Sequence, residues 1–136
     1  MGGGIGIDYK TGIPIDIDSL AKNIAEKVKT NSLKYNLVTP TIFMENGRYI
    51  TGPYGWYVTN LQSIKYNSNN ELFYGLNGSM ADLMRPGMYG AYHAISTIQG
   101  KGSKIYKTPG EYTIANIVGT LCENNDWFAR NRLMKR

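Results

Sequence analysis

The sequence predicts an α+β chain whose two parts follow different patterns. Residues 1–50 hold one helix–strand step of the kind that builds βαβ systems, whereas residues 51–136 hold several short strands separated by turns. With 136 residues, the chain has the length of one ordinary domain. Neither part has enough elements to close a sheet, so we expect both parts to be incomplete, the second of them built from antiparallel strands.

The composition excludes several classes of protein. Apolar residues make up 42% of the chain and tyrosine occurs 11 times, which is too hydrophobic for a disordered protein. No run approaches 18 uncharged apolar residues, as a membrane-spanning helix requires. One cysteine excludes a disulfide scaffold. The first residues lack the basic start and apolar centre of a signal peptide, so we expect a cytoplasmic protein without a membrane partner.

The charge does not point to nucleic acid. Fifteen Lys and Arg against ten Asp and Glu give a net charge of +5, but the basic residues are dispersed. We therefore expect a solvated surface, and a salt-dependent shift on a DNA column would be needed to favour a nucleic-acid partner. No Cys/His spacing suits zinc, and no metal site is expected. The single histidine, His93, lies in an apparent strand and is interpreted as structural.

The first part of the chain is expected to contain a helix between two loops. Either Asp16 or Asp18 can cap the first free amides of that helix. Apolar residues recur every four positions from Leu20 to Val28, which gives the helix one apolar face. Asn31 is a plausible end. A short buried strand is predicted at residues 41–44, and turns are predicted at 45–48 and 52–55.

The second part is expected to be mostly β. Alternating patterns rich in Tyr, Val, Thr and Ile predict strands, and Asn-rich or Gly-rich runs predict the turns between them. A helical turn over residues 79–89 is expected to break at Pro86. The basic tail, residues 130–136, is expected to fray. The predicted strands are 56–66, 71–76, 92–98 and 112–121, with turns at 67–70 and 99–104.

Two motifs in the first part combine groups that bind anions. The run GGGIGIDY at 2–9 lets backbone amides approach an anion without obstruction by a Cβ atom, and its alternative reading is a flexible start. The run ENGR at 45–48 places a carboxylate and a guanidinium at a strand end, where barrels and open sheets bind ligands. Its alternative reading is a surface ion pair.

Two further motifs lie in the second part. The run RPGMY at 85–89 offers a guanidinium and a phenol on a stiff turn, unless it is merely an exposed loop. The run CENND at 122–126 sets a thiol beside a carboxylate at a loop edge, where the thiol could donate a proton. Most lone cysteines are instead small buried hydrophobes.

Taken in order, these motifs resemble the diaminopimelate decarboxylases, which belong to the alanine-racemase-like (fold type III) decarboxylases that depend on pyridoxal 5'-phosphate (PLP). The resemblance is carried by residues 2–9, 44–56, 80–95 and 118–133. It implies that residues 1–50 are the C-terminal part of a PLP-binding (β/α)₈ barrel. It also implies that residues 51–136 are most of an antiparallel β domain, which is incomplete and carries the substrate and dimer-interface loops. The implied reaction converts meso-2,6-diaminopimelate to L-lysine and CO₂ in lysine biosynthesis.

The resemblance also implies roles for cofactor-binding residues. The glycine run matches the family's phosphate cradle, and Glu45 matches the carboxylate that faces the pyridine nitrogen and keeps it protonated. The turn after Glu45 matches the phosphate-binding end of that site. The implied cofactor-binding residues are Gly2, Gly3, Gly4, Glu45, Gly47 and Arg48.

The remaining roles concern the substrate. Arg85 and Tyr89 match residues that hold the substrate's distal carboxylate, and Arg48 matches an arginine that also faces the substrate. Cys122 matches the proposed proton donor, and Glu123 matches the residue that recognises the distal amino group. In the family this loop enters the partner subunit's site, which implies a homodimer.

The sequence departs from the family in places. The family often has Pro where this chain has Asn46, and a second His where it has Ala94. No lysine here matches the one that forms the Schiff base, and the family's C-terminal tyrosine segment has no counterpart. These absences imply a C-terminal fragment that is inactive alone. The alternatives are a decarboxylase of the same fold acting on arginine, ornithine or carboxyspermidine, and a non-enzymatic β module.

Overall fold

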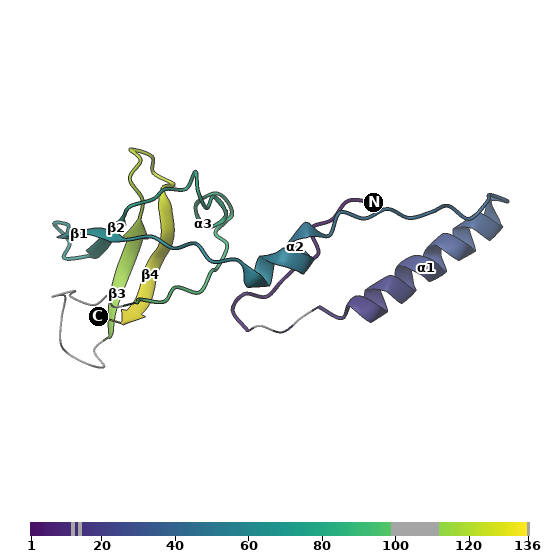
Figure 1. The fold of residues 1–136 in the computed structure, drawn as a ribbon, viewed down its shortest axis with the longest axis horizontal. Coiled ribbons are helices and arrows are strands. Elements are labelled where there is room, and N and C mark those ends of the chain that lie inside the picture. The colour runs from purple at the N-terminus through teal and green to yellow at the C-terminus, as the bar shows by residue number, and fades with distance from the viewer. Residues whose placement is uncertain (12, 14, 99–111, 136) are drawn as a thin grey trace. The chain divides into compact units, whose positions relative to one another are not determined.

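The computed structural model describes residues 1–136 except residues 12, 14, 99–111 and 136, so the predicted loop at 99–104 lies outside the described residues. The chain divides into two compact units, Met1–Gly55 and Trp56–Arg136. The first unit contains α1 (Ile17–Lys34), α2 (Gly47–Thr51) and the 3₁₀-helix η1 (Gly52–Tyr54) (Figure 1). No helix in the described part of the chain combines the length and the apolar content that crossing a membrane requires.

Helix α1 begins where the sequence predicts. The side chain of Asp16 accepts a hydrogen bond from the Ser19 backbone N–H at 3.0 Å, which satisfies one of the free amides of the first turn. The predicted end at Asn31 is wrong, because the helix continues to Lys34. The Asn31 side chain donates to the Lys27 carbonyl at 2.8 Å, one turn back, and so does not compete with the backbone bonds that extend the helix.

The predicted strand at residues 41–44 is wrong. This segment forms no regular strand, and Phe43 is 77% exposed. A strand needs a continuous hydrogen-bonded ladder, and the described residues supply one isolated parallel bridge here, between Gly3 and Glu45. The predicted turn after Glu45 is in fact the start of α2, with Asn46 at its N-cap.

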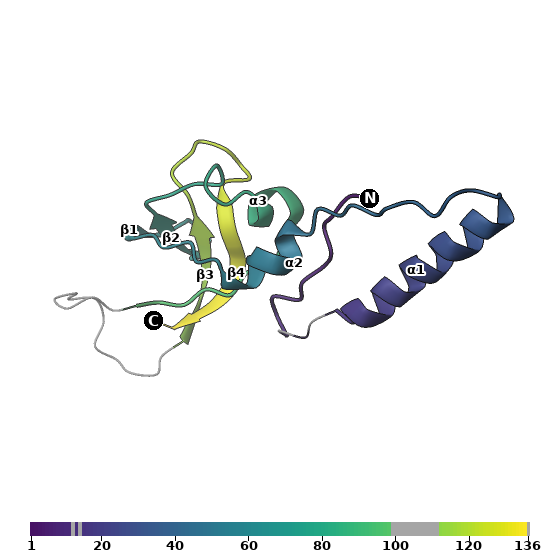
Figure 2. The same ribbon diagram turned by 45° about the vertical axis from the view of Figure 1, so that its right-hand side comes forward.

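The second unit is built on one sheet of four strands in the order β1-β2-β3-β4 (Figures 1 and 2). Pairs β1–β2 and β3–β4 are antiparallel, whereas β2–β3 is parallel. The predicted α+β class is confirmed, with a mixed sheet in place of a fully antiparallel one. The strands are β1 (Leu61–Tyr66), β2 (Leu72–Leu76), β3 (Tyr112–Val118) and β4 (Trp127–Lys135).

The parallel pair follows from the connection between its strands. The tight turn between β1 and β2, closed by the Asn70 N–H donating to the Asn67 carbonyl at 3.0 Å, permits antiparallel pairing. The chain between β2 and β3 runs from residue 77 to residue 111. A connection of that length can return the chain to the same end of the sheet, as a parallel pair requires.

Two further predictions for the second unit are wrong, one for the C-terminal tail and one for residues 92–98. Residues 130–135 belong to β4 and do not fray, because Phe128 and Met134 are buried while β4 pairs with β3. The predicted strand at 92–98 is absent. In that segment the His93 carbonyl accepts a hydrogen bond from the Arg132 side chain at 2.9 Å, so a side chain takes the place of a neighbouring strand.

The expected break at Pro86 is also wrong. Helix α3 (Arg85–Tyr89) has Pro86 in its first turn. The fixed φ of proline suits that position, and the amide it lacks would have no partner within the helix. Proline therefore starts this helix, whereas in a longer helical segment it would interrupt the hydrogen bonding.

The core of the second unit is one cluster of buried side chains. It consists of residues from three of the four strands, and Leu83 and Ile95 pack against it. The buried face of β3 fixes the register of that strand, because a shift by one residue would expose every core side chain of β3. The core residues are Leu72, Ala115, Ile117, Phe128, Ala129 and Met134.

Truncating the core is expected to destabilise the sheet. Ile117 is 2% exposed, and Ile117→Ala should lower the free energy of unfolding by about 2–5 kcal/mol because it leaves a cavity. Ile114 lies on the other face of β3 and is 61% exposed, so Ile114→Ala should change it by less than about 1 kcal/mol. Urea denaturation followed by tryptophan fluorescence measures both. Equal losses for the two variants would contradict this account of the core.

Candidate functional site

The first cluster of predicted site residues forms where the glycine run meets the turn before α2. Gly3 and Glu45 make a parallel bridge, and the Glu45 N–H donates to the Gly2 carbonyl at 3.4 Å. A Cβ atom on Gly3 would overlap the Glu45 carbonyl group. Only glycine therefore allows this approach, and residues more than 40 positions apart are brought together by backbone contacts.

A guanidinium lies beside the same glycine run. The Arg48 Nη1 atom donates to the Gly4 carbonyl at 3.3 Å, and Gly4 has a left-handed φ of 78°. Gly2, Gly4 and Gly47 are exposed, and a Cβ atom on any of them would meet nothing within 4 Å. A guanidinium beside an exposed glycine backbone is a donor set that fits a phosphate or a carboxylate.

The second cluster forms where α3 meets the loop between β3 and β4. A Cβ atom on Gly87 would overlap the backbone carbonyl of Asn125. This close approach joins the helix that carries Arg85 and Tyr89 to the loop, residues 119–126, that carries the predicted proton donor and its neighbouring carboxylate. The structure thus brings together, within this unit, two motifs that are more than 30 residues apart in the sequence.

The side chains of this second cluster are mostly open to solvent. Tyr89 is 68% exposed, and Cys122 is an exposed free thiol. Glu123 is exposed too, and its Oε1 accepts a hydrogen bond from the Asn125 N–H at 3.2 Å. Arg85 is half-buried, and its Nε donates to no atom of the described residues. The exposed thiol and carboxylate are accessible to a polar ligand, whereas the Nε atom of Arg85 is buried.

Sequence reasoning missed the role of Asp126. It is 5% exposed, and its carboxylate accepts the Met80 N–H at Oδ1 and the Leu121 N–H at Oδ2, both at 2.6 Å. An aspartate directly after an Asn-Asn pair in a loop gives a weak signal for such a role. Only the fold shows that the 79–82 turn lies next to this loop.

Arg130 supports the loop at its other side. Its Nη2 atom donates to the Asn124 carbonyl at 3.3 Å, and its guanidinium lies 4.6 Å from the centre of the Trp127 ring. The sequence placed Arg130 in a frayed tail, so this contact was not predicted. The loop is therefore anchored by Asp126 within it and by Arg130 of β4.

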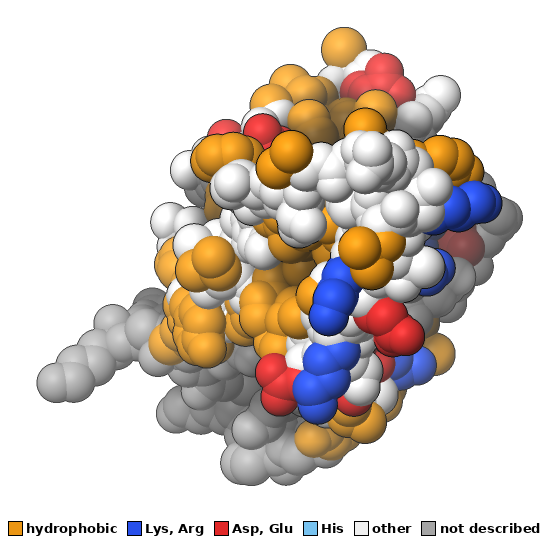
Figure 3. Space-filling view, turned by 90° about the vertical axis from the view of Figure 1, so that its right-hand side faces the viewer, with side chains coloured by type: hydrophobic (Ala, Val, Ile, Leu, Met, Phe, Trp, Pro, Cys, Tyr) orange, Lys and Arg blue, Asp and Glu red, His pale blue; other side chains and the backbone are white. Residues whose placement is uncertain are grey.

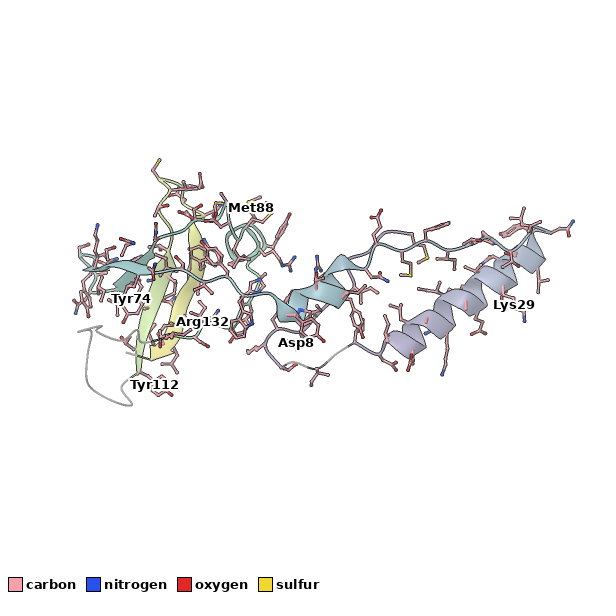
Figure 4. All side chains as sticks on the ribbon, viewed as in Figure 1. Asp8, Lys29, Tyr74, Met88, Tyr112 and Arg132 are labelled. Atoms are coloured by element: carbon pink, nitrogen blue, oxygen red, sulfur yellow. The ribbon has the colours of Figure 1, made fainter. Side chains whose placement is uncertain are left out.

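His93 lies among positive charges in the second unit. Partial burial lowers the pKa of its imidazole, and the guanidinium groups of Arg85 and Arg132 lower it further. Arg132, labelled in Figure 4, also lies 4.2 Å over the Tyr92 ring. The imidazole is therefore held in its neutral form near pH 7.

The lowered pKa of His93 predicts an acid-sensitive fold. The unfolded chain takes up a proton near the ordinary pKa of 6.5, before the folded chain does, so the free energy of unfolding falls as the pH drops below that value. His93→Gln should remove this part of the pH dependence. Urea midpoints measured between pH 7.5 and pH 5 test it, and the same slope in both proteins would contradict the assignment.

A surface hollow lies elsewhere, in the first unit. It has a volume of about 490 Å³ and contains none of the predicted site residues. Figure 3, a space-filling view, shows hydrophobic side chains gathered on the face turned toward the viewer, with charged side chains at their edge. The hollow is lined by Lys27, Val28, Asn31, Ser32, Tyr35, Leu37, Val38 and Pro40.

The chain is similar to known proteins over nearly all its length. Residues 17–136 match the family model described as "Pyridoxal-dependent decarboxylase, C-terminal sheet domain". The chain is 35% identical over 133 residues to diaminopimelate decarboxylase of Methanothermobacter thermautotrophicus. This match covers 97% of this chain and 29% of that protein. It is 36% identical over 135 residues to Protein TabA of Pseudomonas amygdali pv. tabaci, covering 98% and 29%. The chain spans about three tenths of the length of these curated relatives.

Solved structures agree with this relationship. Diaminopimelate decarboxylase from Helicobacter pylori, complexed with L-lysine, has a TM-score of 0.74 and 29% identity, covering 99% of this chain and 29% of that one. AQ1208 from Aquifex aeolicus has a TM-score of 0.75 and 29% identity, covering 99% and 30%. The family that the motifs predicted is thus confirmed. The chain belongs to the pyridoxal-dependent decarboxylases, whose C-terminal sheet domain it contains over residues 17–136.

Proposed function

We propose that this chain is part of a PLP-dependent enzyme that converts meso-2,6-diaminopimelate to L-lysine and CO₂. The backbone contact of Gly3 with Glu45, beside the guanidinium of Arg48, is the observation that carries the proposal. It joins a donor set suited to phosphate to a carboxylate suited to a pyridine nitrogen. Relatives named diaminopimelate decarboxylase, matched over 97% of this chain, support the choice of substrate.

In this proposal the first unit holds the cofactor. Backbone amides of Gly2, Gly3, Gly4 and Gly47, with the Arg48 guanidinium, bind the phosphate of PLP. The Glu45 carboxylate keeps a proton on the pyridine nitrogen. PLP, when bound, supplies a ring that accepts the electron pair left behind when the substrate's carboxylate departs as CO₂.

The second unit recognises the far end of the substrate. Diaminopimelate carries both a carboxylate and an ammonium group there, whereas ornithine and arginine carry no distal carboxylate. Arg85 and Tyr89 bind that carboxylate, and Glu123 pairs with the ammonium group. The exposure of the Glu123 carboxylate on the loop supports its role, because it leaves the carboxylate accessible to the ammonium group of a substrate.

Cys122 completes the reaction in this proposal. The C–C bond to the carboxylate breaks, CO₂ leaves, and the Sγ–H of Cys122 gives its proton to the carbon that lost CO₂. The exposure of the free thiol supports this role. We propose that the loop acts in the site of a second copy of the protein. We also propose that residues 1–50 complete a barrel, with residues 51–136 forming the β domain.

The charge of Glu123 provides the test. In the gene product that carries this chain, Glu123→Gln should raise KM for meso-2,6-diaminopimelate by about 10- to 100-fold, because a hydrogen bond to a charged group is lost, with a much smaller change in kcat. Glu71→Gln removes a carboxylate from an exposed turn of the same unit and should leave KM unchanged. An unchanged KM in Glu123→Gln would rule out its role in recognising the substrate.

A further inference from the structure

The buried carboxylate of Asp126 takes no part in the chemistry proposed above, yet it lies at the base of the loop that carries Cys122 and Glu123. Buried carboxylates are costly unless their oxygens accept hydrogen bonds. Both Asp126 oxygens do so, each from a backbone N–H at 2.6 Å. Short bonds of this kind, to an ionised acceptor, are about twice as strong as bonds between neutral groups.

The two amides belong to different segments of the second unit. Leu121, which donates to Oδ2, immediately precedes Cys122. Met80, which donates to Oδ1, lies in the turn that leads into α3. One carboxylate thus ties the segment before the thiol to the segment before Arg85.

Further backbone bonds close the same loop. The Asp126 N–H donates to the Glu123 carbonyl at 3.0 Å, and the Gly119 N–H donates to the Asp126 carbonyl at 2.9 Å. The Thr120 N–H donates to the Gly78 carbonyl at 3.0 Å, which adds a second link between the loop and the turn. A Cβ atom on Gly119 would overlap the Asp126 carboxylate, so the backbone packs directly against it.

We propose that Asp126 is a positioning residue, which holds the loop that carries Cys122 and Glu123 in place against the turn before α3. The inference rests on the proposed function, because it assigns Asp126 a role in that site. The carboxylate is suited to the task because it only accepts hydrogen bonds and faces two donors. Asparagine has the same shape, and its Oδ1 can accept from only one of the two N–H donors. Its NH₂ group would face the other donor, so that N–H and the NH₂ group would both lack an acceptor.

Asp126→Asn in the gene product that carries this chain tests the proposal. The activity is measured per folded, PLP-loaded molecule, so a loss of stability alone would leave it unchanged. We expect kcat/KM for meso-2,6-diaminopimelate to fall about 10- to 100-fold, since breaking a bond to a buried charged group costs roughly that factor. Both kcat and KM should change, because both the proton donor and the recognition carboxylate move.

Asp82→Asn is the matched control. Asp82 accepts the Ser79 N–H at 2.9 Å and the Tyr57 hydroxyl at 3.0 Å, so it also caps the turn, but among the described residues its side chain makes no hydrogen bond to the loop. The control should retain kcat/KM within about twofold. If Asp126→Asn does not fold, Gly119→Ala serves as the second variant, because it displaces the carboxylate without removing its charge.

A second measurement does not depend on catalysis. Amide hydrogen exchange at Leu121 and Met80, and alkylation of Cys122 by iodoacetamide, should be faster in Asp126→Asn than in wild type and unchanged in Asp82→Asn. Exchange and alkylation rates equal to wild type, or an unchanged kcat/KM, would overturn the positioning role. A wild-type protein without activity on diaminopimelate would overturn the proposed function alone, and the exchange and alkylation rates would still decide whether Asp126 holds the loop.

Discussion

Gly3→Ala is expected to weaken the binding of PLP to the gene product by about 10- to 100-fold. The added Cβ atom would overlap the Glu45 carbonyl, so the glycine run must move away from Glu45 and from α2, which carries Arg48. Forcing an extra methyl group into a close contact typically costs about 1–3 kcal/mol, which corresponds to that loss of affinity. Equilibrium titration with PLP, followed by its visible absorbance, measures the effect.

Gly55→Ala, in the same unit, is the control for this experiment. A Cβ atom at Gly55 would meet nothing within 4 Å, and its φ is −82°. The substitution should leave PLP affinity within about twofold of wild type. Equal affinities for wild type and Gly3→Ala would show that the contact between Gly3 and Glu45 does not form the cofactor site.

Gly87→Ala is expected to lower kcat/KM for meso-2,6-diaminopimelate by about 10- to 100-fold while leaving PLP affinity unchanged. The new Cβ atom would overlap the Asn125 carbonyl and separate α3 from the loop that carries Cys122 and Glu123. Since neither partner is the end of a flexible side chain, the backbone must shift. Steady-state assays of CO₂ release, together with a PLP titration, measure both quantities.

Met88→Ala is the control on the same helix. Met88 is half-exposed on α3 and is labelled in Figure 4. Removing its side chain should leave kcat/KM within about twofold, because the helix keeps its place against the loop. If Gly87→Ala also keeps wild-type kcat/KM, the approach of α3 to the loop has no role in binding the substrate.

The sequence predicted those parts of the fold that local chemistry decides. Asp16 begins α1 because an aspartate side chain satisfies free amides wherever a helix starts. The turn closed by Asn67 and Asn70 formed as expected, since asparagine tolerates the left-handed φ that Asn70 adopts. Such features depend on neighbours within four residues, and the sequence contains all of them.

The errors have a common cause in long-range pairing. Residues 41–44 and 92–98 have the composition of strands, but the described residues provide no ladder for them. The basic residues near the C-terminus led to the prediction of a frayed tail in place of β4. Pairing with β3 forms this strand, and its Met134 is buried. Strand composition is a weak guide because a strand is stabilised by its neighbours in the sheet.

The candidate site shows the same division. The motifs could be found in the sequence, because each places groups that bind or react with a polar ligand within a few residues of one another. The contact of Gly3 with Glu45 and the approach of Gly87 to Asn125 depend on the fold. Asp126 was visible as part of a motif, but its hydrogen bonds to Met80 and Leu121 required the turn and the loop to meet.

The most direct test of the central claim is a comparison of substrates. CO₂ release by the gene product that carries this chain should be measured with PLP and with meso-2,6-diaminopimelate, L-ornithine, L-arginine and carboxyspermidine in turn. We predict a kcat/KM for diaminopimelate at least about 100-fold above the others, because only this substrate uses both the guanidinium of Arg85 and the carboxylate of Glu123. Equal or greater kcat/KM for a substrate without a distal carboxylate would contradict the account.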